Sequence, residues 1–334
     1  MMRLLSKISE FTALIAAIVV GYGVIAIFSQ IEGTEVLSPL DIVLILFGSF
    51  VISTLIAIVA VIAGVGGGVL FTPIMLAFTS IDTLIIRATG LVVAMFSGLI
   101  SSGPFMRKGL ANTRIVFYCA VPFIIGGIGG GTLAIHLDAA MGETADAIVR
   151  LSLGILLLFV AFLFIRGGSK REYPQARADR ISDKLGLGGA YWEESLQKRI
   201  NYRSSRVLLG GFLFLFVGLC AGFFGLGGGW AAVPVLNIVM ATPLKVAAAT
   251  SGVTLAIGNA AAIWPYILYG ALIVLFVVPW MLGQVVGGIM GARLLLRVNV
   301  RFVRYFLIAF LIFSCIRLIT RGIEGLAGID IPFI

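Results

Sequence analysis

Charged side chains are scarce in this chain. Asp, Glu, Lys and Arg make up 12% of its 334 residues, and histidine occurs once. Soluble domains carry about 25% charged residues and about 45–50% apolar ones. Here hydrophobic residues reach 60%, and the mean hydropathy is +1.14. A globule of this size cannot bury that much apolar surface, so a soluble fold is excluded and lipid is the expected solvent.

The patterns of enzymes, metal proteins and ATPases are also missing. We find no nucleophile–base constellation, no metal-ligand spacing and no phosphate loop ending in Gly-Lys-Ser/Thr. Cys119, Cys220 and Cys315 lie inside apolar runs without a CxxC pair, which favours small buried hydrophobes. No Asp or Glu interrupts the middle of an apolar run, where it would indicate an ion or proton relay. The sequence therefore predicts no enzyme and no cofactor.

Apolar runs long enough to cross a bilayer core of about 30 Å recur along the chain. The first follows Arg3 and Lys7 without a convincing cleavage site, so an uncleaved helix is expected rather than a signal peptide. The runs lie at about 11–29, 40–64, 84–106, 113–136, 146–166, 207–225, 246–268, 271–296 and 303–320. The fold class is therefore predicted to be an all-α polytopic membrane protein.

One long polar stretch, 167–206, divides the chain. Its basic residues outnumber its acidic ones, as is typical of a cytoplasmic linker rather than of a nucleic-acid-binding patch. The expected units are an N-terminal transmembrane helix (1–39), a first repeat (40–166), the linker (167–206), a second repeat (207–321) and a C-terminal tail (322–334).

The two halves share one pattern, which indicates duplication. Gly64–Gly68 is followed by Pro73, and Gly225–Gly229 is followed by Pro234, at an offset of 161 residues. The same offset aligns Ala88-Thr89 with Ala249-Thr250, Pro104 with Pro265 and Gly109 with Gly270. After a small gap, Pro122 is aligned with Pro279, Gly126 with Gly283 and Gly130-Gly131 with Gly287-Gly288.

Charge placement sets the expected topology. Two short apolar segments, 66–80 and 227–241, follow the glycine triplets. If each one crosses as a broken or half helix, all basic loops fall on the cytoplasmic side and the acidic loops outside. Each repeat then has five crossings, an odd number, so the halves are predicted to be inverted. The N-terminus is expected in the cytoplasm and the C-terminus outside.

The glycine triplets are the main candidates for a substrate site. Glycine lets a ligand or another backbone approach closely, and a half helix beginning there aims N–H groups into a cavity. Small-residue helix packing is the alternative explanation. The candidate residues are Gly66, Gly67, Gly68, Arg87, Thr89, Gly227, Gly228, Gly229, Thr250, Ser251 and Asn259. The other intramembrane amides, Asn237 and Gln284, are predicted to bond between helices or to line the path.

These segments resemble the TauE/SafE family of membrane permeases, known as sulfite exporters. The resemblance rests on the glycine triplets with their prolines, on Thr89-Gly90 and on Ala248-Ala249-Thr250-Ser251-Gly252, and it covers roughly 41–320. The first half departs from the family pattern, because Gly90 stands where Ser251 stands in the second half and Arg87 replaces a small residue. The resemblance implies a bacterial inner-membrane permease for sulfite, sulfonates such as sulfoacetate, or related organic anions.

We therefore expect a secondary transporter that moves a small anion by alternating access. Its partners are the anionic substrate and the lipid bilayer, with no nucleic acid, and a homo-oligomer is possible. A passive anion channel and a non-transporting membrane scaffold are the alternatives. Coupling to protons, to sodium or to neither stays open, as does the substrate.

Overall fold

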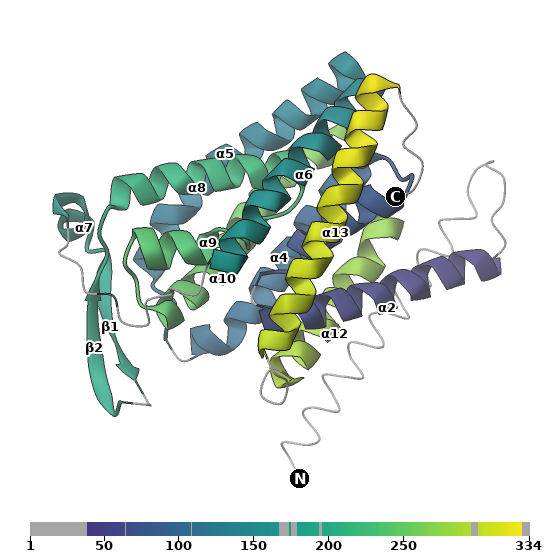
Figure 1. Cartoon of the computed structure of the whole chain (residues 1–334). Coiled ribbons are helices and arrows are strands. Elements are labelled where there is room, and N and C mark those ends of the chain that lie inside the picture. Colours follow the sequence, from purple (N-terminus) through teal and green to yellow (C-terminus); the bar gives the residue numbers. More distant parts are fainter. Residues whose placement is uncertain are drawn as a thin grey trace, which may run out of the picture.

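The computed structural model describes residues 39–63, 65–107, 109–166, 174, 179–193, 196–294 and 300–328. The helix expected at 11–29 lies outside these residues. Within them the first half forms five helices (Figure 1): α2 (Pro39–Ala63), α3 (Gly68–Phe78), α4 (Thr83–Arg107), α5 (Thr113–Met141) and α6 (Glu143–Arg166).

The second half repeats this order with one irregular element. It contains α8 (Val207–Phe224), α9 (Ala232–Pro234), the π-helical turn η1 (Val235–Val239), α10 (Leu244–Ala262), α11 (Trp264–Tyr269), α12 (Val274–Leu294) and α13 (Val300–Ala327). The expected short segment at 227–241 is thus present as a broken helix. Proline removes a backbone donor, so Pro234 favours this irregularity.

Seven described helical segments are long and apolar enough to cross a membrane, which confirms a polytopic helical membrane protein. They are Ile42–Ile62, Thr83–Ile100, Thr113–Met141, Glu143–Phe162, Val207–Phe224, Leu244–Tyr269 and Val274–Gly291. The segment Gly68–Phe78 is apolar but shorter, as expected from the sequence. α13, whose described part carries Arg317, Arg321 and Glu324, is not among the seven.

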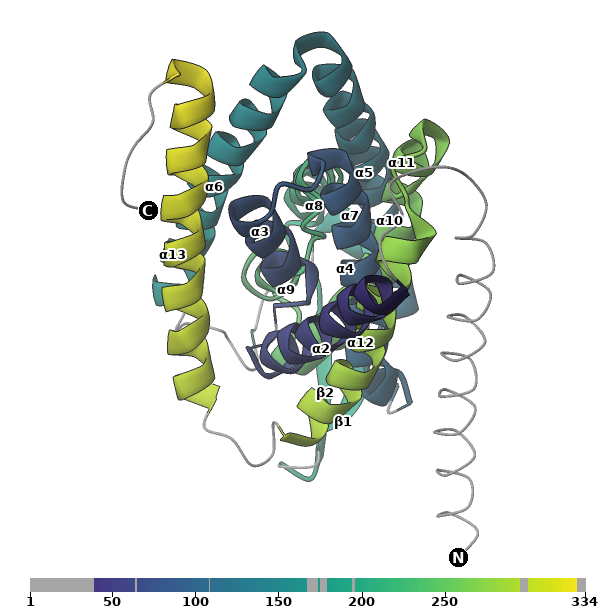
Figure 2. The same ribbon diagram turned by 90° about the vertical axis from the view of Figure 1, so that its right-hand side faces the viewer.

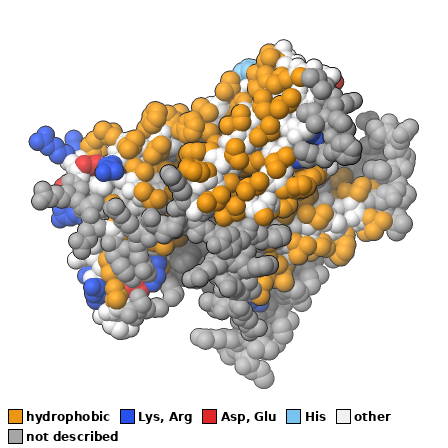
Figure 3. Space-filling model, in the orientation of Figure 1, with side chains coloured by type: hydrophobic (Ala, Val, Ile, Leu, Met, Phe, Trp, Pro, Cys, Tyr) orange, Lys and Arg blue, Asp and Glu red, His pale blue; other side chains and the backbone are white. Residues whose placement is uncertain are grey.

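The outer surface of the bundle fits a lipid environment. Large side chains are exposed on its helices, including Phe117 at 67% and Phe212 at 65%. Figure 3 shows hydrophobic side chains spread over one face of the bundle, while basic and acidic ones gather at the end that carries α7. Exposed apolar surface on this scale is costly in water and favourable in a bilayer.

The linker contains a small folded unit that the sequence analysis did not predict. Helix α7 (Arg180–Leu185) precedes an antiparallel hairpin of β1 (Gly188–Glu193) and β2 (Lys198–Arg203), at one end of the bundle (Figure 1). The hairpin is tied to both halves. The Asn112 side chain donates to the Gly188 carbonyl at 3.0 Å and to the Tyr202 hydroxyl at 2.9 Å. On the other half, Lys245 Nζ pairs with Glu193 at 2.5 Å.

Helices of one half pack against helices of the other in a reciprocal way. α5 lies along α8, and α12 lies along α2, in both views (Figures 1 and 2). A Cβ at Gly126 would overlap the Leu215 carbonyl, and a Cβ at Gly287 would overlap the Thr54 carbonyl. Gly287 is the equivalent of Gly126, and Thr54 is the equivalent of Leu215, each at an offset of 161 residues.

This reciprocity corrects the gapped alignment of the repeats. Gly130 abuts the Leu219 carbonyl, and at the unbroken offset Gly291 abuts Ile58. Gly126 is therefore equivalent to Gly287 and not to Gly283. The prolines Pro122 and Pro279 suggested the gap, but they occupy non-equivalent positions. A proline kink can move along a helix, whereas close glycine contacts fix the helix register.

The equivalent helices α6 and α13 pack on each other in opposite directions (Figure 2). A Cβ at Gly154 would meet the Ile319 side chain at 2.6 Å. Farther back along α6, Leu151 lies against Gly322 and Ala147 against Gly325. Residue numbers at the contact therefore rise along α13 while they fall along α6, so these two helices are antiparallel.

Candidate functional site

The two glycine triplets cross each other at the centre of these contacts. A Cβ at Gly68 would lie 2.5 Å from the Leu226 carbonyl oxygen, and a Cβ at Gly229 would overlap the Val65 carbonyl oxygen. Leu226 and Gly229 are the equivalents of Val65 and Gly68, so the contact is reciprocal. The backbones approach this closely only because both positions lack a side chain.

The middle glycine of each triplet faces a helix of the opposite half. A Cβ at Gly67 would overlap the amide oxygen of Gln284 on α12. A Cβ at Gly228 would lie 2.5 Å from both the Leu255 side chain and the ring of Phe123, which is on α5. Phe123 and Gln284 are equivalent positions. One side of the crossing is thus polar and the other apolar.

The backbone at the crossing is irregular. Gly66 and Gly227 are equivalent, and both have positive φ, +81° and +66°. Side chains at such φ values are strained, which explains glycine at both positions. α3 starts at Gly68, the last residue of the first triplet, and the Gly67 N–H donates to the Ser97 hydroxyl at 2.9 Å. Irregular backbone in a membrane protein is tolerated where it is buried or lines a cavity.

Several buried polar atoms around the crossing have no hydrogen-bond partner among the described residues. The Asn259 side chain is wholly buried, and neither its amide nitrogen nor its amide oxygen is paired. It lies beside Gly227, whose Cβ would be 3.2 Å from the Asn259 nitrogen. The Gln284 amide oxygen and the indole nitrogens of Trp230 and Trp280 are unpaired as well. Buried polar groups are normally satisfied, so this set indicates a ligand or water site.

Trp230, Trp280 and Ser97 were not selected from the sequence. Trp230 directly follows the second triplet, and Trp280 lies one helical turn before Gln284. The ring of Trp280 packs edge-on against Phe71 of α3, with 4.6 Å between ring centroids. The sequence does contain a signal for Trp280. It is an aromatic residue four positions before an amide, Gln284, in an apolar run, so both lie on one face of the helix.

Arg87 is wholly buried near the second triplet, but its guanidinium bonds to protein groups. It donates to the Thr83 carbonyl at 3.2 Å, to the Thr83 hydroxyl at 2.8 Å and to the Phe223 carbonyl at 3.4 Å. The Thr83 hydroxyl in turn donates to Asp146 at 2.6 Å. Arg87 therefore links the start of α4 to the end of α8, where helix carbonyls lack intrahelical partners.

The three hydroxyl candidates all have hydrogen-bond partners within the protein. Thr89 donates to the Ile85 carbonyl at 2.8 Å, and Ser251 donates to the Ala248 carbonyl at 3.0 Å. Each hydroxyl has one hydrogen, so neither has one left for an oxyanion in this conformation. The Thr250 hydroxyl accepts from the Asn112 N–H at 3.2 Å, next to the hairpin. Among the candidates, the structure brings together the six glycines and Asn259.

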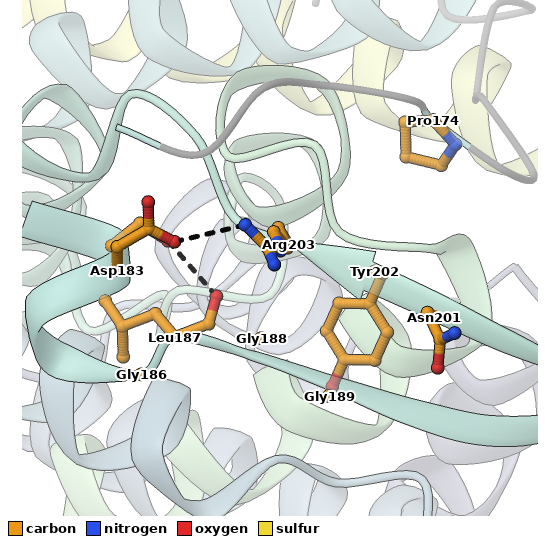
Figure 4. A pocket seen from close by; sticks show the side chains of 10 residues that line it. Pro174, Asp183, Gly186, Leu187, Gly188, Gly189, Asn201, Tyr202 and Arg203 are labelled. Carbon is orange, nitrogen blue, oxygen red and sulfur yellow. Dashed lines mark hydrogen bonds and ion pairs between the residues drawn. The ribbon is translucent and has the colours of Figure 1, made fainter. Parts of the chain in front are cut away.

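A separate cavity of about 600 Å³ lies at the hairpin, away from the crossing. It is lined by α7 and both strands, and Figure 4 shows Asp183 and Arg203 pairing across it, at 3.5 Å. This cavity is open, and its ion pair is exposed. No group of three or more His, Cys, Asp or Glu within the described ranges is placed to hold a metal ion.

A sequence model of the family described as sulfite exporter TauE/SafE matches residues 49–318. That range includes both triplets and every residue of the crossing. The chain belongs to the TauE/SafE family. It is similar to the "Probable membrane transporter protein YunE" of Bacillus subtilis (strain 168), at 21% identity over 286 residues, which cover 82% of this chain and 99% of the relative. No solved structure matches the chain. Family and relative support a membrane transporter.

Proposed function

We propose that this protein is a secondary transporter for a small anion such as sulfite, sulfoacetate or another organosulfonate or organic anion. The observation that carries the proposal is the set of buried, unpaired polar atoms around the glycine crossing. Three of them are N–H donors, on Asn259, Trp230 and Trp280. Neutral N–H groups in a dry, apolar setting bind oxyanions well, because water does not compete for them.

The first helical turn of α3 adds to this setting. Its leading N–H groups have no acceptor within the helix, and the positive end of the helix dipole faces the crossing. Unwound segments at the meeting point of two repeats hold the substrate in many secondary transporters. Gly66, where a Cβ would meet no atom closer than 3.8 Å, would let an anion approach the backbone there.

Alternating access fits the way the two halves meet. The antiparallel packing of α6 on α13 supports the inverted orientation of the repeats. The closest backbone contacts at the crossing join one half to the other, at Gly68–Leu226 and Gly229–Val65. Rocking one half against the other would open the site to each side in turn. The basic linker and the loop around Arg114 favour a cytoplasmic hairpin, with the protein in a bacterial-type inner membrane and its C-terminus outside.

Flux measurements in proteoliposomes test the proposal. Purified protein is given labelled sulfite, sulfoacetate or acetate, under imposed pH or sodium gradients. We expect saturable movement of a sulfur oxyanion that accelerates under one of the gradients, which also identifies the coupling ion. Non-saturable flux that ignores every gradient would identify a passive channel instead. If no anion moves while the protein stays folded, the transporter proposal is wrong.

A further inference from the structure

We propose that Gln284 selects substrates that carry a hydrogen-bond donor in addition to their anionic group. This inference rests on the proposed transport function and concerns the same site. It starts from one atom, the amide oxygen of Gln284, which is buried and has no hydrogen-bond partner among the described residues. An oxygen of this kind accepts hydrogen bonds and repels the oxygens of an anion.

The orientation of the Gln284 amide is set by chemistry. The Ser53 hydroxyl donates to the Trp280 carbonyl at 2.6 Å, so its only hydrogen is in use. Towards Gln284, both the Ser53 hydroxyl and the Ser53 carbonyl can then only accept. The Gln284 nitrogen donates to them at 3.2 and 3.3 Å. Rotating the amide by half a turn would set its oxygen against two acceptors, so the nitrogen faces Ser53 and the oxygen faces away.

The oxygen side of the amide points at the first glycine triplet. It lies where a Cβ of Gly67 would be. The Gly67 N–H is not available, because it donates to the Ser97 hydroxyl. Only the α-hydrogens of Gly67 remain close by, and they offer a weak C–H···O contact. The Gln284 oxygen therefore needs a donor that the described residues do not supply.

The residues of the crossing also carry unpaired donors. The indole N–H of Trp280, one turn earlier on α12, is buried and unpaired, as are that of Trp230 and the amide nitrogen of Asn259. A plain oxyanion satisfies these donors and leaves the Gln284 oxygen unpaired. A substrate with an anionic head and a hydroxyl or ammonium group satisfies both kinds of group. Phe123 occupies the equivalent position in the other half, so the requirement applies to one end of the substrate only.

Three sulfonates of similar size test the inference in proteoliposomes. They are 2-hydroxyethanesulfonate, 2-aminoethanesulfonate and propane-1-sulfonate, in which a methyl group replaces the hydroxyl. Sites that hydrogen-bond a substrate reject the analogue that lacks the group far more strongly than an apolar pocket rejects a small change in size. We expect a kcat/KM at least tenfold lower for propane-1-sulfonate than for the two donor-bearing sulfonates.

Substitution of Gln284 then assigns the preference to that residue. Gln284→Leu should bring the hydroxyl- and methyl-bearing substrates to within about twofold of each other, and Gln284→Glu should favour the ammonium-bearing one. Gln197→Leu, a matched change in the hairpin turn, should leave the ratios as in the wild type. Thermal denaturation of each variant checks that it is folded.

Equal transport of all three sulfonates by the wild type would overturn the inference, since a water molecule would then satisfy the Gln284 oxygen. Equal transport that requires sodium would overturn it too, because the oxygen would then bind a cation. Both outcomes leave the transport proposal intact. If no sulfonate or sulfite moves under any gradient, the proposed function fails as well.

Discussion

The substitutions Gly67→Ala and Gly229→Ala distinguish the part of the crossing that we propose binds substrate from the part that holds the two halves together. Alanine fits the backbone at both positions, because Gly67 has φ −64° and Gly229 has no positive φ. The new Cβ would overlap a neighbour in each case. At Gly229 that neighbour is the Val65 carbonyl, and at Gly67 it is the Gln284 amide.

The two neighbours differ in how easily they can move. The Val65 carbonyl belongs to the backbone, so an alanine at Gly229 must separate the halves locally, at a cost of about 1–3 kcal/mol. This is a large share of the roughly 5–15 kcal/mol that stabilises a typical fold. The Gln284 amide ends a flexible side chain. It can rotate away from Gly67 for the loss of its bonds to Ser53, about 1 kcal/mol.

Thermal unfolding in detergent measures the loss of stability, and flux in proteoliposomes measures the loss of transport. We expect Gly229→Ala to lower the apparent melting temperature by roughly 3–10 °C. Gly67→Ala should lower it by less than about 3 °C but slow anion flux at least tenfold. Gly129→Ala is the control, because its Cβ meets no atom within 4 Å. Wild-type stability of Gly229→Ala, or equal destabilisation by both variants, would refute the reasoning.

Three further predictions concern the surroundings of the crossing. Arg87→Met should destabilise the protein by about 2–4 kcal/mol in thermal unfolding, since it leaves buried acceptors such as the Phe223 carbonyl unpaired; a stable variant with altered KM would instead indicate substrate contact. Asn259→Leu should leave the melting temperature unchanged or raised while flux falls at least tenfold, because its amide has no partner to lose; reduced stability would contradict this. Asn112→Ala should increase proteolysis of the hairpin by removing its bonds to Gly188 and Tyr202, and unchanged cleavage would argue against that docking.

Much of the fold could be predicted from local composition. A membrane helix satisfies its own backbone and needs only a long apolar run, so α2, α4, α5, α6, α8 and α12 were expected within a few residues of their observed bounds. The short segments after the triplets were expected as well. The hairpin was not, because its strands hold few apolar residues and contact Asn112 and Lys245, which lie far away in sequence.

The candidate site was predicted only in part. The repeated triplets lie together in the structure, because duplication marks positions that meet at the boundary of two repeats, and Asn259 lies beside Gly227. Thr89 and Ser251 were selected for their hydroxyls, yet each donates to its own helix. Whether a hydroxyl faces a ligand or a carbonyl depends on a rotamer, and the sequence does not specify rotamers.

The sequence by itself determined that this chain is a membrane protein, that it is built from two related halves, and that a glycine triplet recurs at equivalent positions of the two halves. Hydropathy and repeated spacing depend only on residue type and order, so no coordinates were needed. Only the tertiary structure decided the register of the repeats, the antiparallel packing of α6 on α13, and the burial of Gln284 beside Gly67. These depend on contacts between residues more than 80 positions apart, whose partners are set when the two halves pack together.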